Sequence, residues 1–123
     1  MKALMSIKPE FVDRIFSGEK RYEFRKRGFG KPVESVVVYS SSPERVVRGE
    51  FSISAIRHGT PKYIWRLCRR FAGVDRKRFF EYFKDCEVAY AIEVGETMEF
   101  QIPKSLQADY ACLPPQSYCY IEG

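Results

Sequence analysis

The amino-acid sequence predicts an α+β fold in which a small β-barrel of about six strands carries helices packed around it. Several short segments alternate apolar and polar side chains, which is the pattern of strands with one buried face. Three other segments repeat apolar side chains at helical spacing, and two of these helices lie together just before the final strands. At 123 residues the chain has the length of one domain, so we expect a single domain over residues 1–123.

The first part of the chain is predicted to alternate strands with one helix. Residues 2–7 form a strand, and residues 9–17 form a helix whose apolar side chains share one stripe: Phe11, Val12, Ile15 and Phe16. Pro9 suits the first turn of that helix, where a missing N–H costs nothing, and Gly18 suits a left-handed C-cap. Alternation resumes over residues 20–26, which therefore form the next strand.

Two further strands are predicted before the middle of the chain. Residues 36–39 are a continuous apolar run, consistent with a strand buried on both faces, and residues 46–57 alternate. Gly49, inside the longer strand, suggests a bulge or a close backbone approach. The turn between the two strands consists of Ser40, Ser41, Ser42 and Pro43.

Two helices are predicted next, followed by the last strands. The first helix has Thr60 as N-cap and ends at Gly73, and its buried stripe is Ile64, Trp65, Cys68 and Phe71. The second runs from a cap at Asp75 through Lys84 and buries Phe79, Phe80 and Phe83. Alternation then predicts strands over residues 88–94, 97–102 and 119–121.

The charge of the chain is distributed unevenly. The net charge is +5, but residues 1–80 carry 19 Lys and Arg against 8 Asp and Glu, whereas residues 81–123 carry 2 against 8. Because both parts fold together, one molecule has a basic side and an acidic side. A concentrated basic face attracts polyanions, of which nucleic acid is the commonest. A positive surface that serves solubility alone would also account for the net charge.

Composition argues against a membrane protein and against a metal site. No apolar run approaches the ~20 residues that a membrane span needs, and the apolar residues before Lys8 are too few for a signal peptide, so we expect a cytoplasmic protein without membrane contact. The four cysteines form no C-x-x-C pair, and His58 is the only histidine. We therefore expect reduced thiols, no metal and no cofactor.

The strongest functional candidates follow the first helix. Glu23 and Arg25 share one strand face, about 7 Å apart at ~3.3 Å per residue, and Lys20 can join them only from the turn or across a bulge. Lys20 would hold a phosphate or, when desolvated, act as a base. Glu23 would accept hydrogen bonds from the exocyclic amine of a base or act as general base on water, and Arg25 offers a planar fork for phosphate, carboxylate or a base edge. The alternative is a solvated Glu23–Arg25 ion pair that contributes less than ~1 kcal/mol.

Other residues are candidates for ligand contacts. The predicted helix after Thr60 presents a basic face without acidic residues: Lys62, Arg66, Arg69 and Arg70. Ser41 and Ser42 would either donate to a ligand from the end of a buried strand or cap the following turn. Lys8 lies beside a helix N-terminus, whose free N–H groups favour anions. Tyr22 or Tyr90 would stack on a base or pack in the core.

Four short motifs occur in order along the chain: Ser6-Ile7-Lys8-Pro9, Gly18-x-Lys20-x-x-Glu23-x-Arg25, Tyr39-x-Ser41-Ser42-Pro43 and Gly49-Glu50-Phe51. This order resembles the ASCH domain, a member of the PUA-like superfamily, over about residues 2–102. The resemblance implies a PUA-like β-barrel with a cleft between barrel and helices. It also implies that the signature residues Lys20, Glu23 and Arg25 line the cleft, and that the domain binds RNA or nucleotides.

The resemblance leaves an enzymatic function open. One branch of ASCH proteins hydrolyses the acetyl amide of modified cytidine, and another has been assigned ribonuclease activity; either would use Lys20 and Glu23 as catalytic groups here. The hydrolase branch places a threonine where this chain has Glu23 and uses a glutamate from the inserted helices. Residues 60–80 depart from that pattern, because Asp75 is their only acid.

Three functions are compatible with the sequence. The first, which we expect, is an RNA- or nucleotide-binding domain with phosphates along the basic helix face and a base or nucleotide in the Lys20/Glu23/Arg25 cleft. The second is a small nucleoside amidohydrolase or ribonuclease. The third is a protein-interaction adaptor in which the basic and acidic sides pair between copies.

Overall fold

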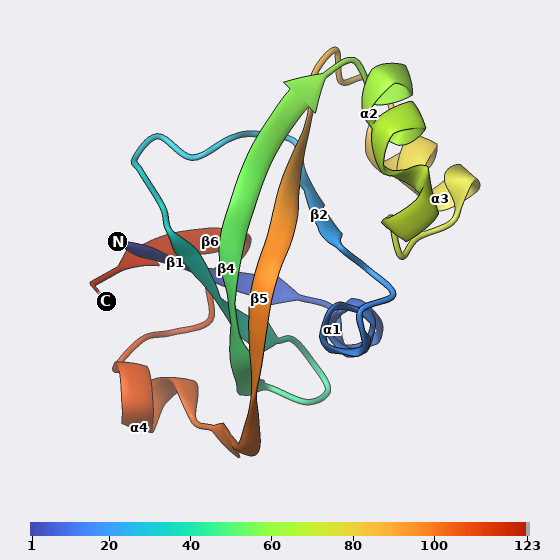
Figure 1. Cartoon of the computed structure of the whole chain (residues 1–123). Coiled ribbons are helices and arrows are strands. Elements are labelled where there is room, and N and C mark those ends of the chain that lie inside the picture. Colours follow the sequence, from blue (N-terminus) through green and yellow to red (C-terminus); the bar gives the residue numbers. More distant parts are fainter. Residues whose placement is uncertain (123) are drawn as a thin grey trace.

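The structure is a computed structural model, and it describes residues 1–122. Its elements in chain order are β1 (Lys2–Ile7), α1 (Pro9–Ser17), β2 (Tyr22–Arg25), β3 (Ser35–Ser40), β4 (Val46–Gly59), α2 (Pro61–Cys68), a 3-10 turn η1 (Arg69–Phe71), α3 (Arg76–Tyr82), β5 (Ala89–Lys104), α4 (Leu106–Tyr110) and β6 (Tyr118–Ile121). The predicted α+β fold is confirmed, with six strands in one sheet and the helices packed around it (Figure 1).

The sheet is curled into a half-barrel with strand order β2-β5-β4-β3-β1-β6. β1 and β3 are parallel, and the other neighbouring strands are antiparallel. β2 and β6 are the two edge strands, and within residues 1–122 no strand pairing joins them. The half-barrel therefore has an open seam between the β2 edge and the β1–β6 edge.

Three apolar clusters cover both faces of the sheet. The first packs α1 against the sheet and includes Met5, Val12, Ile15 and Phe51. The second packs α2 and α3 against the β2–β5 end of the sheet and includes Phe24, Ile64, Phe79 and Phe83. The third lies beside α4 and includes Leu4, Val37, Val47 and Leu106. Since β3 contributes to the first and third clusters, its buried character on both faces is confirmed.

Several local predictions are confirmed by the backbone. α1 spans Pro9–Ser17 and ends at Gly18, whose φ of 89° is the left-handed conformation that glycine adopts without strain. The pairing of β4 with β5 shifts register beside Gly49, and a Cβ there would lie 2.3 Å from the Met98 carbonyl oxygen. Within residues 1–122, no helix combines the length and apolarity needed to cross a bilayer.

The last two alternating segments form one strand, contrary to the prediction of two. β5 runs without interruption from Ala89 to Lys104, although the alternation breaks near Gly95. Register shifts in β4 opposite this point let the strand continue, and the Glu96 N–H donates to Ser52 Oγ at 2.8 Å. A Cβ on Gly95 would lie 2.5 Å from Ser52 Oγ, so only glycine fits this close approach.

The helix after Thr60 is shorter than predicted, and one of its predicted core residues is exposed. α2 ends at Cys68 and continues as the 3-10 turn, which advances three residues per turn instead of 3.6. That change turns Phe71 outward, where it is 45% exposed, and places Ala72 in the core instead. α4 was not predicted, because five residues capped by Ser105 are too short to show a helical period.

The position of Phe71 predicts a contrast in stability. Phe79→Ala removes a ring that is 2% exposed from the second cluster and should lower the free energy of unfolding by about 3–5 kcal/mol. Phe71→Ala, the matched control, should lower it by less than about 1 kcal/mol because close to half of this residue is already exposed to water. Urea unfolding of the two variants measures both values, and equal losses would contradict this assignment of the core.

Candidate functional site

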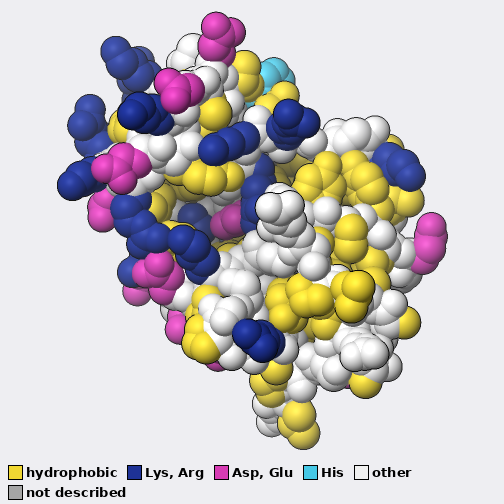
Figure 2. All heavy atoms as spheres, turned by 180° about the vertical axis from the view of Figure 1, so that it is seen from behind, with side chains coloured by type: hydrophobic (Ala, Val, Ile, Leu, Met, Phe, Trp, Pro, Cys, Tyr) yellow, Lys and Arg dark blue, Asp and Glu magenta, His cyan; other side chains and the backbone are white. Residues whose placement is uncertain are grey.

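A pocket of about 470 Å³ opens where β1, the start of α1, β2 and α3 meet. Figure 2 shows a hollow on this side of the molecule, with acidic and basic atoms in its depth and basic side chains around it. The residues that line it come from three separate segments of the chain: Ser6, Ile7, Lys8, Phe11, Lys20, Glu23, Phe24, Arg25, Val74, Arg78, Phe79, Glu81 and Tyr82.

Lys20 is a buried cation at this pocket, with only 2% of its surface exposed. Its Nζ donates to the Ala72 carbonyl oxygen at 2.7 Å and lies 3.9 Å from Glu23 Oε1. The ammonium also sits over the rings of Phe24 and Phe11, at 4.7 and 5.1 Å from their centroids. Burial lowers the pKa of Lys20 from 10.5 to about 8, because Glu23 compensates the desolvation only in part.

Backbone contacts fix Lys20 in this position. After Gly18 ends α1, the Lys20 N–H donates to the Arg14 carbonyl at 2.9 Å, and the next N–H donates to the Phe71 carbonyl at 2.8 Å. Gly73 lies against the stem of Lys20, and its φ is 66°; a Cβ there would lie 2.3 Å from the Lys20 Cβ. The segment between α2 and α3 therefore covers Lys20, and its close approach leaves no room for a side chain at position 73.

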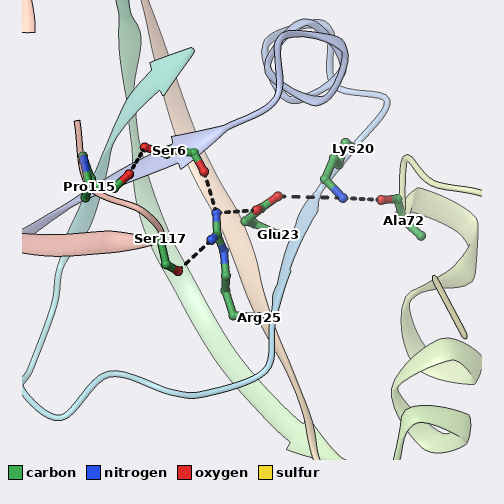
Figure 3. A network of polar contacts seen from close by, with 7 residues as sticks. All are labelled: Ser6, Lys20, Glu23, Arg25, Ala72, Pro115 and Ser117. Atoms are coloured by element: carbon green, nitrogen blue, oxygen red, sulfur yellow. Dashed lines mark hydrogen bonds and ion pairs between the residues drawn. The ribbon is translucent and has the colours of Figure 1, made fainter. Parts of the chain in front are cut away.

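Glu23 and Arg25 share one face of β2, as the alternation predicted. Arg25 Nη2 donates to Glu23 Oε2 at 2.9 Å and to the Ser6 carbonyl oxygen at 3.1 Å, and its Nη1 donates to Ser117 Oγ at 3.0 Å. Ser6 Oγ in turn donates to the Pro115 carbonyl at 2.6 Å. Figure 3 shows this chain of contacts running from Lys20 through Glu23 and Arg25 to the C-terminal segment.

Arg25 is therefore committed to the protein itself. It joins β2, at one edge of the open seam, to β1 and to Ser117, the residue before β6, at the other edge. Both terminal nitrogens of the guanidinium donate to protein acceptors, and among residues 1–122 its buried Nε has no hydrogen-bond partner. Its chemical effect is to hold the Glu23 carboxylate by Oε2 and to leave Oε1 directed towards Lys20 and the pocket.

The walls of the pocket are aromatic and its rim is charged. Phe24, Phe79 and Tyr82 form an apolar wall, and Tyr82 is 42% exposed. Lys8 and Arg78 contribute positive charge, although Arg78 also pairs with Glu10 at 3.0 Å. A pocket that combines aromatic walls with oriented charged groups is typical of a small-molecule site.

The predicted site residues divide into two groups. The first group lines the pocket and consists of Lys8, Lys20, Glu23 and Arg25. Lys20 reaches Glu23 from the turn before β2, as the sequence required. Ser41 and Ser42 do not line it; the Ser41 N–H donates to the Ile7 carbonyl, and the Ser41 carbonyl accepts from the Glu44 N–H to close the turn. The basic helix face also lies outside the pocket, on the exposed side of α2 and η1: Lys62, Arg66, Arg69 and Arg70.

The stacking candidates from the sequence are not at the pocket. Tyr22 packs beside the second cluster, and Tyr90 stacks on His58 with their centroids 5.6 Å apart. Tyr82 lines the pocket instead. Nothing in the local sequence marks it, because its position depends on how α3 docks on β2.

One carboxyl group at the pocket lies just outside residues 60–80, the segment in which Asp75 is the only acid. Glu81, on α3, lines the pocket beside Tyr82 and lies just beyond residues 60–80. No group of three metal-ligating side chains gathers anywhere in residues 1–122, and the four cysteines are free, with Cys68 buried.

The depressed pKa of Lys20 predicts a pH effect on stability. Between pH 8 and 10.5 the unfolded chain keeps the proton of Lys20 that the folded chain has lost, so the free energy of unfolding should rise with pH over this window. Lys20→Met should lack this increment. Urea unfolding of both proteins at pH 7.5, 8.5 and 9.5 measures the difference, in which the titrations of other groups cancel. Parallel pH profiles would contradict the low pKa.

Comparisons with known proteins agree with the fold and the motifs. No family model matches the chain. An ASCH domain-containing ribonuclease of Zymomonas mobilis is 28% identical over 127 residues, which cover 98% of this chain and 84% of that protein. The crystal structure of ASCH from Zymomonas mobilis superimposes with a TM-score of 0.88 at 26% identity, covering 98% of this chain and 87% of that one.

Two further relatives are much longer proteins of Ureaplasma parvum. One is an ATP synthase subunit alpha, 28% identical over 120 residues, and the other is the large ribosomal subunit protein uL22, 25% identical over 120 residues. The match covers 97% of this chain in each case, but only 15% and 39% of those proteins. Agreement with the Zymomonas protein over nearly the whole of both chains, in sequence and in fold, identifies this chain as an ASCH domain with the PUA-like fold.

Proposed function

We propose that this ASCH domain binds RNA and takes one nucleotide into the pocket at Lys20 and Glu23. The observation that carries the proposal is the buried Lys20–Glu23–Arg25 array beside an aromatic wall. A pocket of about 470 Å³ lies within the range of roughly 300–1,000 Å³ that small-ligand sites occupy. A free nucleotide or nucleoside derivative would use the same contacts.

The polar groups of the pocket offer one acceptor and one donor side by side. Glu23 Oε1 accepts from an N–H of the base, as carboxylates do from the exocyclic amine of cytosine. Lys20 Nζ, 3.9 Å away, donates to an adjacent carbonyl or ring nitrogen. Because Arg25 holds the carboxylate and the Ala72 carbonyl holds the ammonium, both groups are already oriented before a ligand arrives.

Positive charge at the rim of the pocket and on the neighbouring helix face supports a polyanionic ligand. Lys8 and Arg78 stand at the pocket, where the phosphate of a bound nucleotide would lie. Further phosphates would lie along the basic helix face: Lys62, Arg66, Arg69 and Arg70. Two of the relatives bear names connected with RNA, a ribonuclease and a protein of the large ribosomal subunit.

The pocket is tested by a substitution that preserves shape. Glu23→Gln keeps the size of the side chain but replaces one acceptor oxygen and removes the charge that faces Lys20, so we expect the affinity for nucleoside monophosphates to fall at least tenfold. Isothermal titration measures it, with Glu87→Gln at an exposed position as the control. Affinity for an RNA oligomer should also fall steeply from 50 to 200 mM salt. Equal affinities of the two variants, or no salt dependence, would contradict the proposal.

A second function, cleavage of RNA or of a modified nucleoside, is favoured by the pKa of Lys20. At a pKa of about 8, roughly one in ten Lys20 side chains is neutral at pH 7, so that the amine can accept a proton from an attacking hydroxyl or water. The ammonium formed on Lys20 would then return this proton to the leaving group, and the Glu23 carboxylate, 3.9 Å away, would stabilise that ammonium. Arg25 would act only by positioning Glu23.

This second function makes a distinct prediction. If neutral Lys20 is the base, the cleavage rate should rise about tenfold per pH unit up to pH 8 and level off above it. Lys20→Met should abolish turnover, whereas Lys84→Met, at an exposed position on the same protein, should leave it unchanged. Assays use RNA oligomers and acetylated cytidine. Binding of these compounds without any turnover would leave the domain as a binding module.

A further inference from the structure

An exposed apolar stripe runs along the outer side of α2 and η1. Tyr63, Leu67 and Phe71 recur every four residues, and they are 50%, 43% and 45% exposed. The opposite side of the same helix is buried in the second cluster through Ile64 and Cys68. Figure 1 shows α2 at the outer end of the molecule, beyond the sheet. We call these three residues the α2 stripe.

The two rings of the α2 stripe are held in place by their neighbours. Tyr63 lies against Gly59, where a Cβ would approach its Cδ2 to 2.7 Å. Phe71 has the guanidinium of Arg21 5.6 Å from its centroid. Successive members of the stripe are about 6 Å apart along the helix, given 1.5 Å per residue. Each ring thus packs against a neighbour on one side and leaves about half of the residue exposed.

The charge around the α2 stripe is uncompensated. Residues 60–74 contain no Asp or Glu. Among the described residues, none of the cations that flank the stripe forms an ion pair with a carboxylate: Arg21, Lys62, Arg66, Arg69 and Arg70. Arg48 on β4 differs, because it pairs with Asp13, Glu44 and Glu99. The stripe is therefore apolar along its centre and positive along its sides.

We propose that the α2 stripe is a binding path for single-stranded RNA, with bases stacked on Tyr63 and Phe71 and phosphates on the flanking cations. The charge requires an anionic partner, and the exposed rings require one with flat apolar faces; a single strand has both. In a duplex the bases are paired and stacked on one another, so their faces are not available to stack on the rings. This deepens the proposed function, since it adds a second contact and specifies the strandedness of the RNA.

The α2 stripe ends at the segment that covers Lys20. The Phe71 carbonyl accepts from the Arg21 N–H, and the carbonyl of the following residue, Ala72, accepts from Lys20 Nζ at the pocket. A strand stacked on the stripe therefore ends beside the segment that covers Lys20. A nucleotide in the pocket and its neighbours on the stripe would belong to one RNA chain.

The test compares ring-removing and ring-keeping variants of the full chain. Tyr63→Ala with Phe71→Ala should weaken binding of a fluorescein-labelled 12-nucleotide oligouridylate by roughly tenfold per ring, measured by fluorescence anisotropy. Tyr63→Phe with Phe71→Tyr keeps both platforms and should bind within about twofold of the unmodified protein. The ring-removing variant should leave the slope of log affinity against log salt unchanged, whereas Arg66→Gln with Arg69→Gln should reduce it by about 1.4.

Three results would overturn the proposal. The first is unchanged oligouridylate binding by the ring-removing variant when circular dichroism shows it folded. The second is an equal loss of binding to inorganic polyphosphate, which has charge but no bases. The third is equally tight binding of the oligouridylate annealed to oligoadenylate. The proposal that the pocket binds a nucleotide fails separately. In that case mononucleotides would not bind, but removing the two rings would still weaken binding of the oligouridylate.

Discussion

The hydrogen bonds of Arg25 close a structure that its backbone leaves open. The sheet ends at β2 on one side and β6 on the other, and the guanidinium spans the seam to Ser6 and Ser117 while it holds Glu23. A side chain with several donors in a rigid plane is suited to this, because it satisfies acceptors on three segments at once. The pocket lies beside this seam because no strand occupies it.

Lys20 performs the corresponding task for the helical insertion. Its ammonium is bonded to the Ala72 carbonyl, so the segment between β4 and β5 is tied to the turn between α1 and β2. Burying this cation is unfavourable, and one carboxylate at 3.9 Å and two aromatic faces offset the penalty incompletely. The low pKa of Lys20 is the direct expression of that imbalance. A group held in such a state is available for ligand contact or proton transfer.

The helical insertion also separates two surfaces of different chemistry. α3 presents Phe79, Glu81 and Tyr82 to the pocket, whereas α2 presents its cations and the α2 stripe to solvent. Both surfaces depend on the second apolar cluster, in which Phe79 contacts Phe24 edge to face at 4.9 Å. The packing of one aromatic cluster therefore orients both the proposed nucleotide site and the proposed strand path.

Local patterns in the sequence were sufficient to predict most helices and strands and the charged residues of the pocket. The period-two pattern of β2 placed Glu23 and Arg25 on one face, and Pro9 and Gly18 bounded α1. These features depend on neighbours within a few residues, so a local pattern records them. The merging of two predicted strands into β5 required the register shifts in β4, which no local pattern shows.

The sequence by itself determined which residue types stand at the junction of α1 and β2, and that they are able to form a charged array. Only the tertiary structure decided that Arg25 donates its hydrogen bonds to Ser6 and Ser117. It also decided that Glu81 and Tyr82 line the pocket and that Phe71 faces solvent. The reason is that these contacts join segments 19 to 92 residues apart or depend on a 3-10 turn. Long-range packing sets such contacts, and the periodicity of one segment carries no record of them.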